Sequence, residues 1–372
     1  MNAKKRKNGK IELMRFVFTM CVLLFHFNRG LWDGKKGITE SISFFAKGNI
    51  CVEFFFLVSG FLMAKTLHSQ LQREAAHPEL AAENAGEGIG DATLRFLWHK
   101  VKGILPYQWA FSAIMAVFLC LSKPETMPDG ILKKLPSLLL LNRTGIMADS
   151  ASFLRVDWYL SSMLIAMAIL YPLCRRFGKT FTRLVAPLSA LLILGYMMYT
   201  VGELGGGSRW DGLTFHCNLR ALAEIALGAT CYEVYTVMSK RTFSRFQQLL
   251  ISITELACYL ITLRYVCSFA SSKYHTDIVL LLCVAITLSF SQKGLLGESR
   301  LFQNSVCEFL GAISLPVYLC QIIIREGVIY YLPNLQPKCQ CLLMVIMTLA
   351  LGIVSYLIVS SVQRRKARAA RA

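Results

Sequence analysis

The sequence predicts an all-α integral membrane protein, a polytopic bundle of about ten transmembrane helices with both termini cytoplasmic. Three observations predict this fold class. Apolar residues make up 55% of the 372 residues and the mean hydropathy is +0.49, which is more than a soluble core of this length requires. Apolar runs long enough to cross a bilayer of about 30 Å recur along nearly the whole chain. Lys and Arg residues cluster at the ends of these runs.

Each expected helix corresponds to one apolar run of suitable length. The predicted spans are 11–29, 48–67, 104–122, 157–174, 184–202, 219–238, 249–267, 276–291, 305–324 and 340–361. An even number of spans places both termini on one side of the membrane. The more basic connections fall on that side, which the positive-inside rule identifies as cytoplasmic. The outward-facing segments are then 30–47, 123–156, 203–218, 268–275 and 325–339.

The net charge of +18 does not indicate a nucleic-acid partner, because the basic residues lie at the ends of apolar segments. The thirteen cysteines are scattered through those segments like small hydrophobic residues. Cys339 and Cys341 form a C-x-C without a nearby His, so neither a metal site nor a disulfide framework is expected. The bilayer is the predicted partner of this chain, and no oligomeric state is predicted.

Two connections are long. Residues 70–94 are polar and rich in Ala and Gly, and we expect a cytoplasmic linker there. The outer loop 123–156 contains KKLPSLLLL at 133–141, which is too short to span the membrane. That segment is expected to be re-entrant or interfacial.

The first span, IELMRFVFTMCVLLFHF, carries three ionisable groups. Arg15 and His26 are eleven residues apart, which brings them within about 20° of one helix face and separates them by about 16 Å along the axis. Glu12 and Thr19 lie on the same face. Glu12 and Arg15 fit an interfacial ion pair, and His26 fits a histidine bonded to a backbone carbonyl near the outer surface. A neutral imidazole in a dry cavity is also a good general base at neutral pH.

Further polar groups lie within the other spans. Glu53 is placed in the outer half of the second span, either as an interfacial residue or as a partner for the first helix. The Ser59-Gly60 pair predicts a close helix contact or a local bend. Arg220 and Glu224, four residues apart, fit an ion pair that neutralises itself inside the bundle.

Two more spans carry recognisable polar residues. The ninth span places Ser314, Tyr318 and Gln321 on one hydrogen-bonding face. Asp157 and Trp158 open the fourth span as an N-cap and an interfacial aromatic residue would.

Cations precede the third span in RFLWHKVKGILPYQW, residues 95–109. Arg95, Lys100 and Lys102 are explained by positive-inside anchoring. The same residues would also suit the phosphates of a nucleotide-like donor such as coenzyme A.

In this order, the segments resemble membrane-bound acyltransferase family 3, the O-acyltransferases of surface glycans. Arg15 and His26 match the family's R-x10-H element, and VEFFFLVSGFLM at 52–63 matches its acidic-FF-x-x-SGF helix. WYLSSMLIAMAILYP at 158–172 and GAISLPVYLCQ at 311–321 are similar to two later elements. Three positions differ: Gln321 stands where the family has His, Gly103 where it has a second Arg, and Met163 where many members are acidic.

The resemblance implies one acyltransferase-3-like transmembrane domain at 11–361, flanked by a basic cytoplasmic N-terminus at 1–10 and a basic tail at 362–372. It implies a multi-pass protein of the cell membrane that moves an acyl group, most simply acetyl, from cytoplasmic acyl-CoA to a hydroxyl of an extracytoplasmic carbohydrate, without a metal. His26 would be the general base, oriented by Glu53, and Arg15, Lys100, Lys102 and Arg95 would bind the donor. The candidate substrate-binding residues are Ser59, Trp158, Arg220, Glu224, Ser314, Tyr318 and Gln321.

Two alternatives remain open. The buried charges could form the proton relay of a transporter or flippase for a polar or lipid-linked substrate. Because the sequence shows no inverted repeats, this alternative is the weaker one. The chain could also be a catalytically altered membrane scaffold with the same fold.

Overall fold

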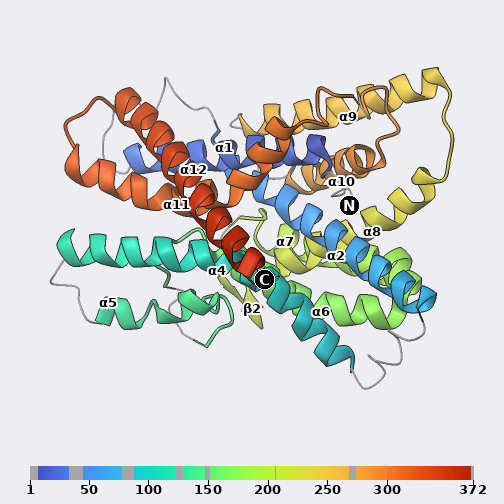
Figure 1. Cartoon of the computed structure of the whole chain (residues 1–372), viewed down its shortest axis with the longest axis horizontal. Helices are drawn as coiled ribbons and strands as arrows, with labels where there is room; N and C mark the ends of the chain where they lie inside the picture. Colours follow the sequence, from blue (N-terminus) through green and yellow to red (C-terminus); the bar gives the residue numbers. More distant parts are fainter. Residues whose placement is uncertain are drawn as a thin grey trace.

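A computed structural model of the chain describes residues 7–32, 45–77, 88–122, 129–146, 151–205, 207–267, 274–297 and 299–369. A helix occupies the site of every predicted span (Figure 1). The long helices are α1 (Gly9–Trp32), α2 (Cys51–Ala76), α4 (Ile89–Ser122), α6 (Trp158–Thr180), α7 (Ala186–Thr200), α8 (His216–Ser239), α9 (Arg245–Val266), α10 (His275–Ser291), α11 (Ser305–Tyr331) and α12 (Pro337–Ala369). The predicted all-α membrane fold is therefore confirmed.

Short elements complete the described part of the chain. They are η1 (Gly48–Ile50), α5 (Asp129–Leu132), η3 (Leu135–Leu139), a π-helical turn η4 (Phe181–Val185) and the antiparallel strands β1 (Trp210–Asp211) and β2 (Thr214–Phe215).

In the described part of the chain, 6 helical segments are long and apolar enough to cross a membrane. One of them is the continuous segment Trp158–Thr200, which contains both α6 and α7. The helix α10 has only 17 residues, and α8 carries Arg220, Glu224 and Glu233. The number of ten membrane crossings and the cytoplasmic location of both termini therefore stay predictions.

Two predicted connections contain more helix than expected. The connection between the predicted spans 157–174 and 184–202 is not an open loop, because the helix continues through it around a kink at Gly178. The φ of 49° and ψ of −122° at Gly178 interrupt the helical geometry. The helices α2 and α4 extend to Ala76 and from Ile89, so they take up both ends of the predicted linker 70–94. The centre of that linker, 78–87, lies outside the described residues.

The outer loop 123–156 packs on α4 where the structure describes it. Gln108 donates from Nε2 to the carbonyl oxygen of Ser137 at 3.0 Å, and Trp109 donates from Nε1 to that of Leu138 at 2.9 Å. These bonds hold η3, the centre of the KKLPSLLLL segment, against the outer half of α4. Residues 123–128 and 147–150 lie outside the described part.

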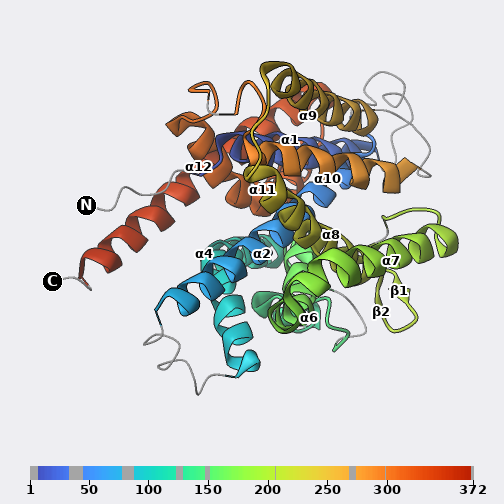
Figure 2. The same ribbon diagram turned by 90° about the vertical axis from the view of Figure 1, so that its right-hand side faces the viewer.

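The helices α2 and α8 cross between two groups of helices. Figure 2 shows α1, α9, α10 and α11 above them and α6 and α7 below. The crossing is made backbone to backbone: a Cβ added at Gly60 would lie 2.0 Å from the carbonyl oxygen of Ile225, and one at Gly228 would lie 2.1 Å from that of Leu57. The close helix contact predicted from Ser59-Gly60 is confirmed.

Gly60→Ala should lower the free energy of unfolding by about 1 to 3 kcal/mol, because the added methyl group meets a rigid backbone carbonyl. Gly103→Ala is the matched control. It is also a helix-interior glycine, but an added Cβ there meets nothing within 4 Å. The control should raise stability by about 0.5 to 1 kcal/mol. Unfolding of both variants in detergent tests this, and equal midpoints for the two would contradict the close crossing.

Candidate functional site

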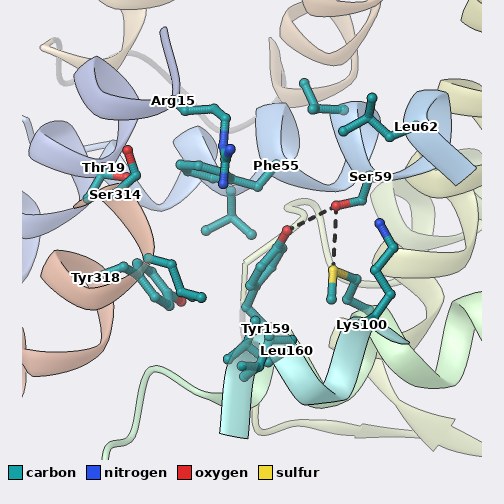
Figure 3. Close-up of a pocket in the computed structure, with 16 residues that line it drawn as sticks. Arg15, Thr19, Phe55, Ser59, Leu62, Lys100, Tyr159, Leu160, Ser314 and Tyr318 are labelled. Carbon is teal, nitrogen blue, oxygen red and sulfur yellow. Dashed lines mark hydrogen bonds between the residues drawn. The ribbon is translucent and has the colours of Figure 1, made fainter. Parts of the chain in front are cut away.

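A cavity of about 340 Å³ lies between α1, α2, α4, α6 and α11 (Figure 3). We call it the central cavity. Its wall carries both cationic side chains and hydroxyl groups. Its polar lining residues are Arg15, Thr19, Ser59, Lys100, Tyr159, Ser314 and Tyr318.

The cationic lining residues are Arg15 from α1 and Lys100 from α4. Arg15 Nη1 lies 3.2 and 3.3 Å from the two carboxylate oxygens of Glu12, so the predicted ion pair is present. Glu12 is buried against Gly311, where an added Cβ would lie 1.9 Å from Glu12 Oε2. Lys100 Nζ lies 5.5 Å from the ring centre of Phe96. Because one Glu accompanies the two cations, the cavity favours an anion beside them.

The hydroxyl groups other than that of Thr19 come from α2, α6 and α11. Ser59 Oγ lies 3.4 Å from the hydroxyl of Tyr159 and also 3.4 Å from the sulfur of Met163 (Figure 3). Tyr318 donates its hydroxyl to the carbonyl oxygen of Val156 at 2.7 Å, and Ser314 donates to that of Leu310 at 3.0 Å. The hydroxyl protons of Tyr318 and Ser314 are used on backbone carbonyls, so the Ser59–Tyr159 pair is the donor available to a bound carbonyl or a sugar hydroxyl.

Glu53 is bound to Arg220 across the α2–α8 crossing. Arg220 Nε donates to Glu53 Oε2 at 2.8 Å, and Nη2 donates to Glu53 Oε1 and to the carbonyl oxygen of Asn49. Glu224 Oε1 lies 3.4 Å from Arg220 Nε. The predicted pair of Arg220 and Glu224 is therefore present, and Arg220 also pairs with Glu53. Both oxygens of Glu53 accept from Arg220, and the orientation of His26 by Glu53 stays a prediction.

Several predicted site residues do not line the central cavity. His26 is half-buried near the outer end of α1, with its ring centre 5.2 Å from that of Phe25. Gln321 is fully buried and donates to the carbonyl oxygen of Tyr318 at 2.8 Å. Lys102 Nζ lies over the ring of Trp98 at 5.3 Å, and Arg95 is exposed on α4. The predicted donor-binding cations thus divide into two that line the cavity and two that do not.

Tyr159 and Gly103 also line the cavity, although neither is among the site residues predicted from the sequence. Gly103 marks open space: an added Cβ there meets nothing within 4 Å. Space for a longer side chain is therefore present at this position of α4.

The comparisons with known proteins point to one family. The family model described as "Acyltransferase domain" matches residues 8–362, nearly the whole chain. Neither a curated protein nor a solved structure matches the chain significantly.

Proposed function

Because the chain belongs to this acyltransferase family and is a helical membrane protein, we propose that it transfers an acyl group, most simply acetyl, from cytoplasmic acyl-CoA to a hydroxyl of an extracytoplasmic carbohydrate. The observation that carries this proposal is the central cavity itself. It combines two cations, Arg15 and Lys100, with a row of hydroxyl groups inside a membrane bundle. The cations suit donor phosphates, and the hydroxyl groups suit the reacting carbonyl.

The proposed reaction is a direct acyl transfer. The His26 imidazole takes the proton of the acceptor hydroxyl, the oxygen attacks the thioester carbonyl carbon, and coenzyme A leaves as its thiol after taking up a proton. The hydroxyl groups of Tyr159 and Ser59 would donate hydrogen bonds to the developing oxyanion.

The distance that a bound donor must span follows from the positions of Arg15 and His26 on α1. His26 lies about 16 Å beyond Arg15 along the helix axis. The phosphates at Arg15 and Lys100 and the thioester near His26 would therefore be joined by the slender pantetheine arm. Thr19, which lies between them on the same helix and lines the cavity, would contact that arm.

Lys100→Met should raise the KM for acetyl-CoA about tenfold or more, because one charge-assisted contact to a phosphate is lost. Lys102→Met is the matched control: it removes a charge two residues away on the same helix but outside the central cavity. The control should leave the KM unchanged. Equal donor affinity in both variants, measured by titration of the purified protein, would contradict the phosphate role of the cavity.

Reconstituted vesicles separate transfer from transport. Labelled acetyl-CoA is supplied on one side and an oligosaccharide acceptor on the other. Covalent label on the acceptor is expected, whereas movement of substrate without modification would support the transporter alternative.

A further inference from the structure

A second cavity, of about 470 Å³, lies in the part of the molecule predicted to face outward. We call it the outer pocket. Its walls come from the segments 123–156 and 203–218 and from the first residue of α6. Among the described residues that line it, three are cations and none carries a carboxylate. The polar and aromatic lining residues are Lys134, Arg143, Ser152, Arg155, Trp158 and Ser208.

Arg143 is the most informative residue of this pocket. Its exposed fraction is only 6%, yet Nε and Nη1 are buried without a hydrogen-bond partner. Its backbone is fixed on both sides: the N–H donates to Ser161 Oγ at 3.1 Å, and the carbonyl oxygen accepts from Asn218 Nδ2 at 2.8 Å. The guanidinium lies 5.2 Å from the ring centre of Phe215. A desolvated cation without hydrogen bonds to an anion is costly, so an anionic ligand would stabilise this arrangement.

The carboxylate of Asp157 does not supply the missing anionic partner of Arg143. Asp157 Oδ1 accepts from Ser152 at 2.5 Å and from Asn142 at 3.2 Å, and Oδ2 accepts from Gln108 at 2.8 Å. Burial lowers the pKa of Arg143, and the charges of Cys217 and Asp157 act in the opposite direction. Asp157 thus organises the outer loop, and Nε and Nη1 of Arg143 donate no hydrogen bond to it.

The other two cations leave donors for a ligand. Lys134 Nζ donates to the carbonyl oxygen of Gly130 at 3.1 Å, which occupies one of its three protons. Arg155 Nη1 lies 3.9 Å from Glu326 Oε1, and the Arg155 side chain is 67% exposed, so this ion pair is weak. Glu326 on α11 is the acidic group that faces Arg155.

Trp158 connects the outer pocket to the central cavity. Its indole lines the outer pocket, and the next residue, Tyr159, lines the central cavity. The ring centre of the indole lies 6.4 Å from that of Phe56 and 5.8 Å from the guanidinium of Arg220, and a Cβ added at Gly207 would lie 3.6 Å from the indole. A rigid aromatic face beside several cations suits a sugar ring that carries a negative charge.

We infer that the outer pocket binds an acidic sugar, with the carboxylate or phosphate on Arg143 and the sugar ring beside Trp158 at the pocket wall. This inference rests on the proposed function, because the bound sugar would be the acceptor whose hydroxyl is acylated. It deepens that function by assigning the acceptor to the class of anionic carbohydrates.

Equilibrium binding to the purified full chain tests the inference independently of catalysis. The probes are an oligogalacturonate, its carboxyl-reduced neutral counterpart, and galactose 1-phosphate. We expect an acidic probe to bind at least tenfold more tightly than the neutral one, and Arg143→Gln to weaken that binding about 10- to 100-fold. Arg209→Gln is the matched control, because Arg209 is exposed nearby but does not line the outer pocket. If Arg143→Gln fails to fold, Lys134→Gln should still weaken binding severalfold.

The outcomes are distinct. Preference for oligogalacturonate or for the sugar phosphate identifies the source of the anionic group. Equal binding of acidic and neutral probes, or unchanged binding in folded Arg143→Gln, would overturn the inference. Acetyl transfer from labelled acetyl-CoA is measured in parallel. Binding that depends on Arg143 without any transfer would support the outer pocket and count against the proposed function. Transfer to neutral acceptors alone would support the proposed function and count against an acidic sugar in the outer pocket.

Discussion

His26→Ala should lower the rate of acyl transfer by about 10²- to 10⁴-fold, the usual contribution of a general base. The affinity for acetyl-CoA should not change, because His26 does not line the central cavity in which the donor phosphates are proposed to bind. Removal of the imidazole leaves the acceptor hydroxyl protonated and therefore a weak nucleophile. The measurement is the transfer of labelled acetyl groups by purified protein at saturating donor.

His99→Ala is the control for His26→Ala, because His99 is an exposed histidine on α4 that lines neither cavity. Its transfer rate should match that of the wild type. Both variants must be shown to reach the membrane in equal amounts. A His26→Ala protein that acylates at the rate of the control would eliminate the proposed mechanism.

Arg220→Met should destabilise the protein by about 3 to 5 kcal/mol, the usual cost of removing one partner of a buried ion pair. Glu53 and Glu224 are both fully buried, so the variant leaves two carboxylates without their shared cation. The double variant Arg220→Met/Glu53→Met should recover part of the loss, because one buried carboxylate is removed with the cation.

An exposed ion pair provides the comparison. The Arg183 side chain is 56% exposed in its pair with Glu233, and Arg183→Met should cost less than about 1 kcal/mol. Denaturant unfolding in a defined detergent measures all three variants. If Arg220→Met cost no more than Arg183→Met, the buried cluster would not hold α2 to α8.

The fold could be predicted because membrane insertion depends on local sequence. Length and hydropathy located every long helix, and the spacing of Glu12 and Arg15 correctly predicted their ion pair. Hydropathy did not predict the kink at Gly178. The segment around Gly178 is basic and was expected to be a loop, but it forms a distorted helix.

The site was predictable only in part. Arg15, Ser59, Lys100, Ser314 and Tyr318 do line one cavity. The partner of Glu53 lies far away in the chain, on a helix whose approach depends on glycine contacts that hydropathy does not encode.

The glycine contact between α2 and α8 also constrains how substrates can enter. Ser59, on the wall of the central cavity, directly precedes Gly60, whose backbone abuts α8. Because this wall cannot separate from α8 without parting two backbones in van der Waals contact, we expect α2 and α8 to stay together when a substrate enters. Any opening of the cavity is then expected at its other helices, α1, α4, α6 and α11. Distance measurements between labelled pairs should therefore show constant α2–α8 spacing through the catalytic cycle.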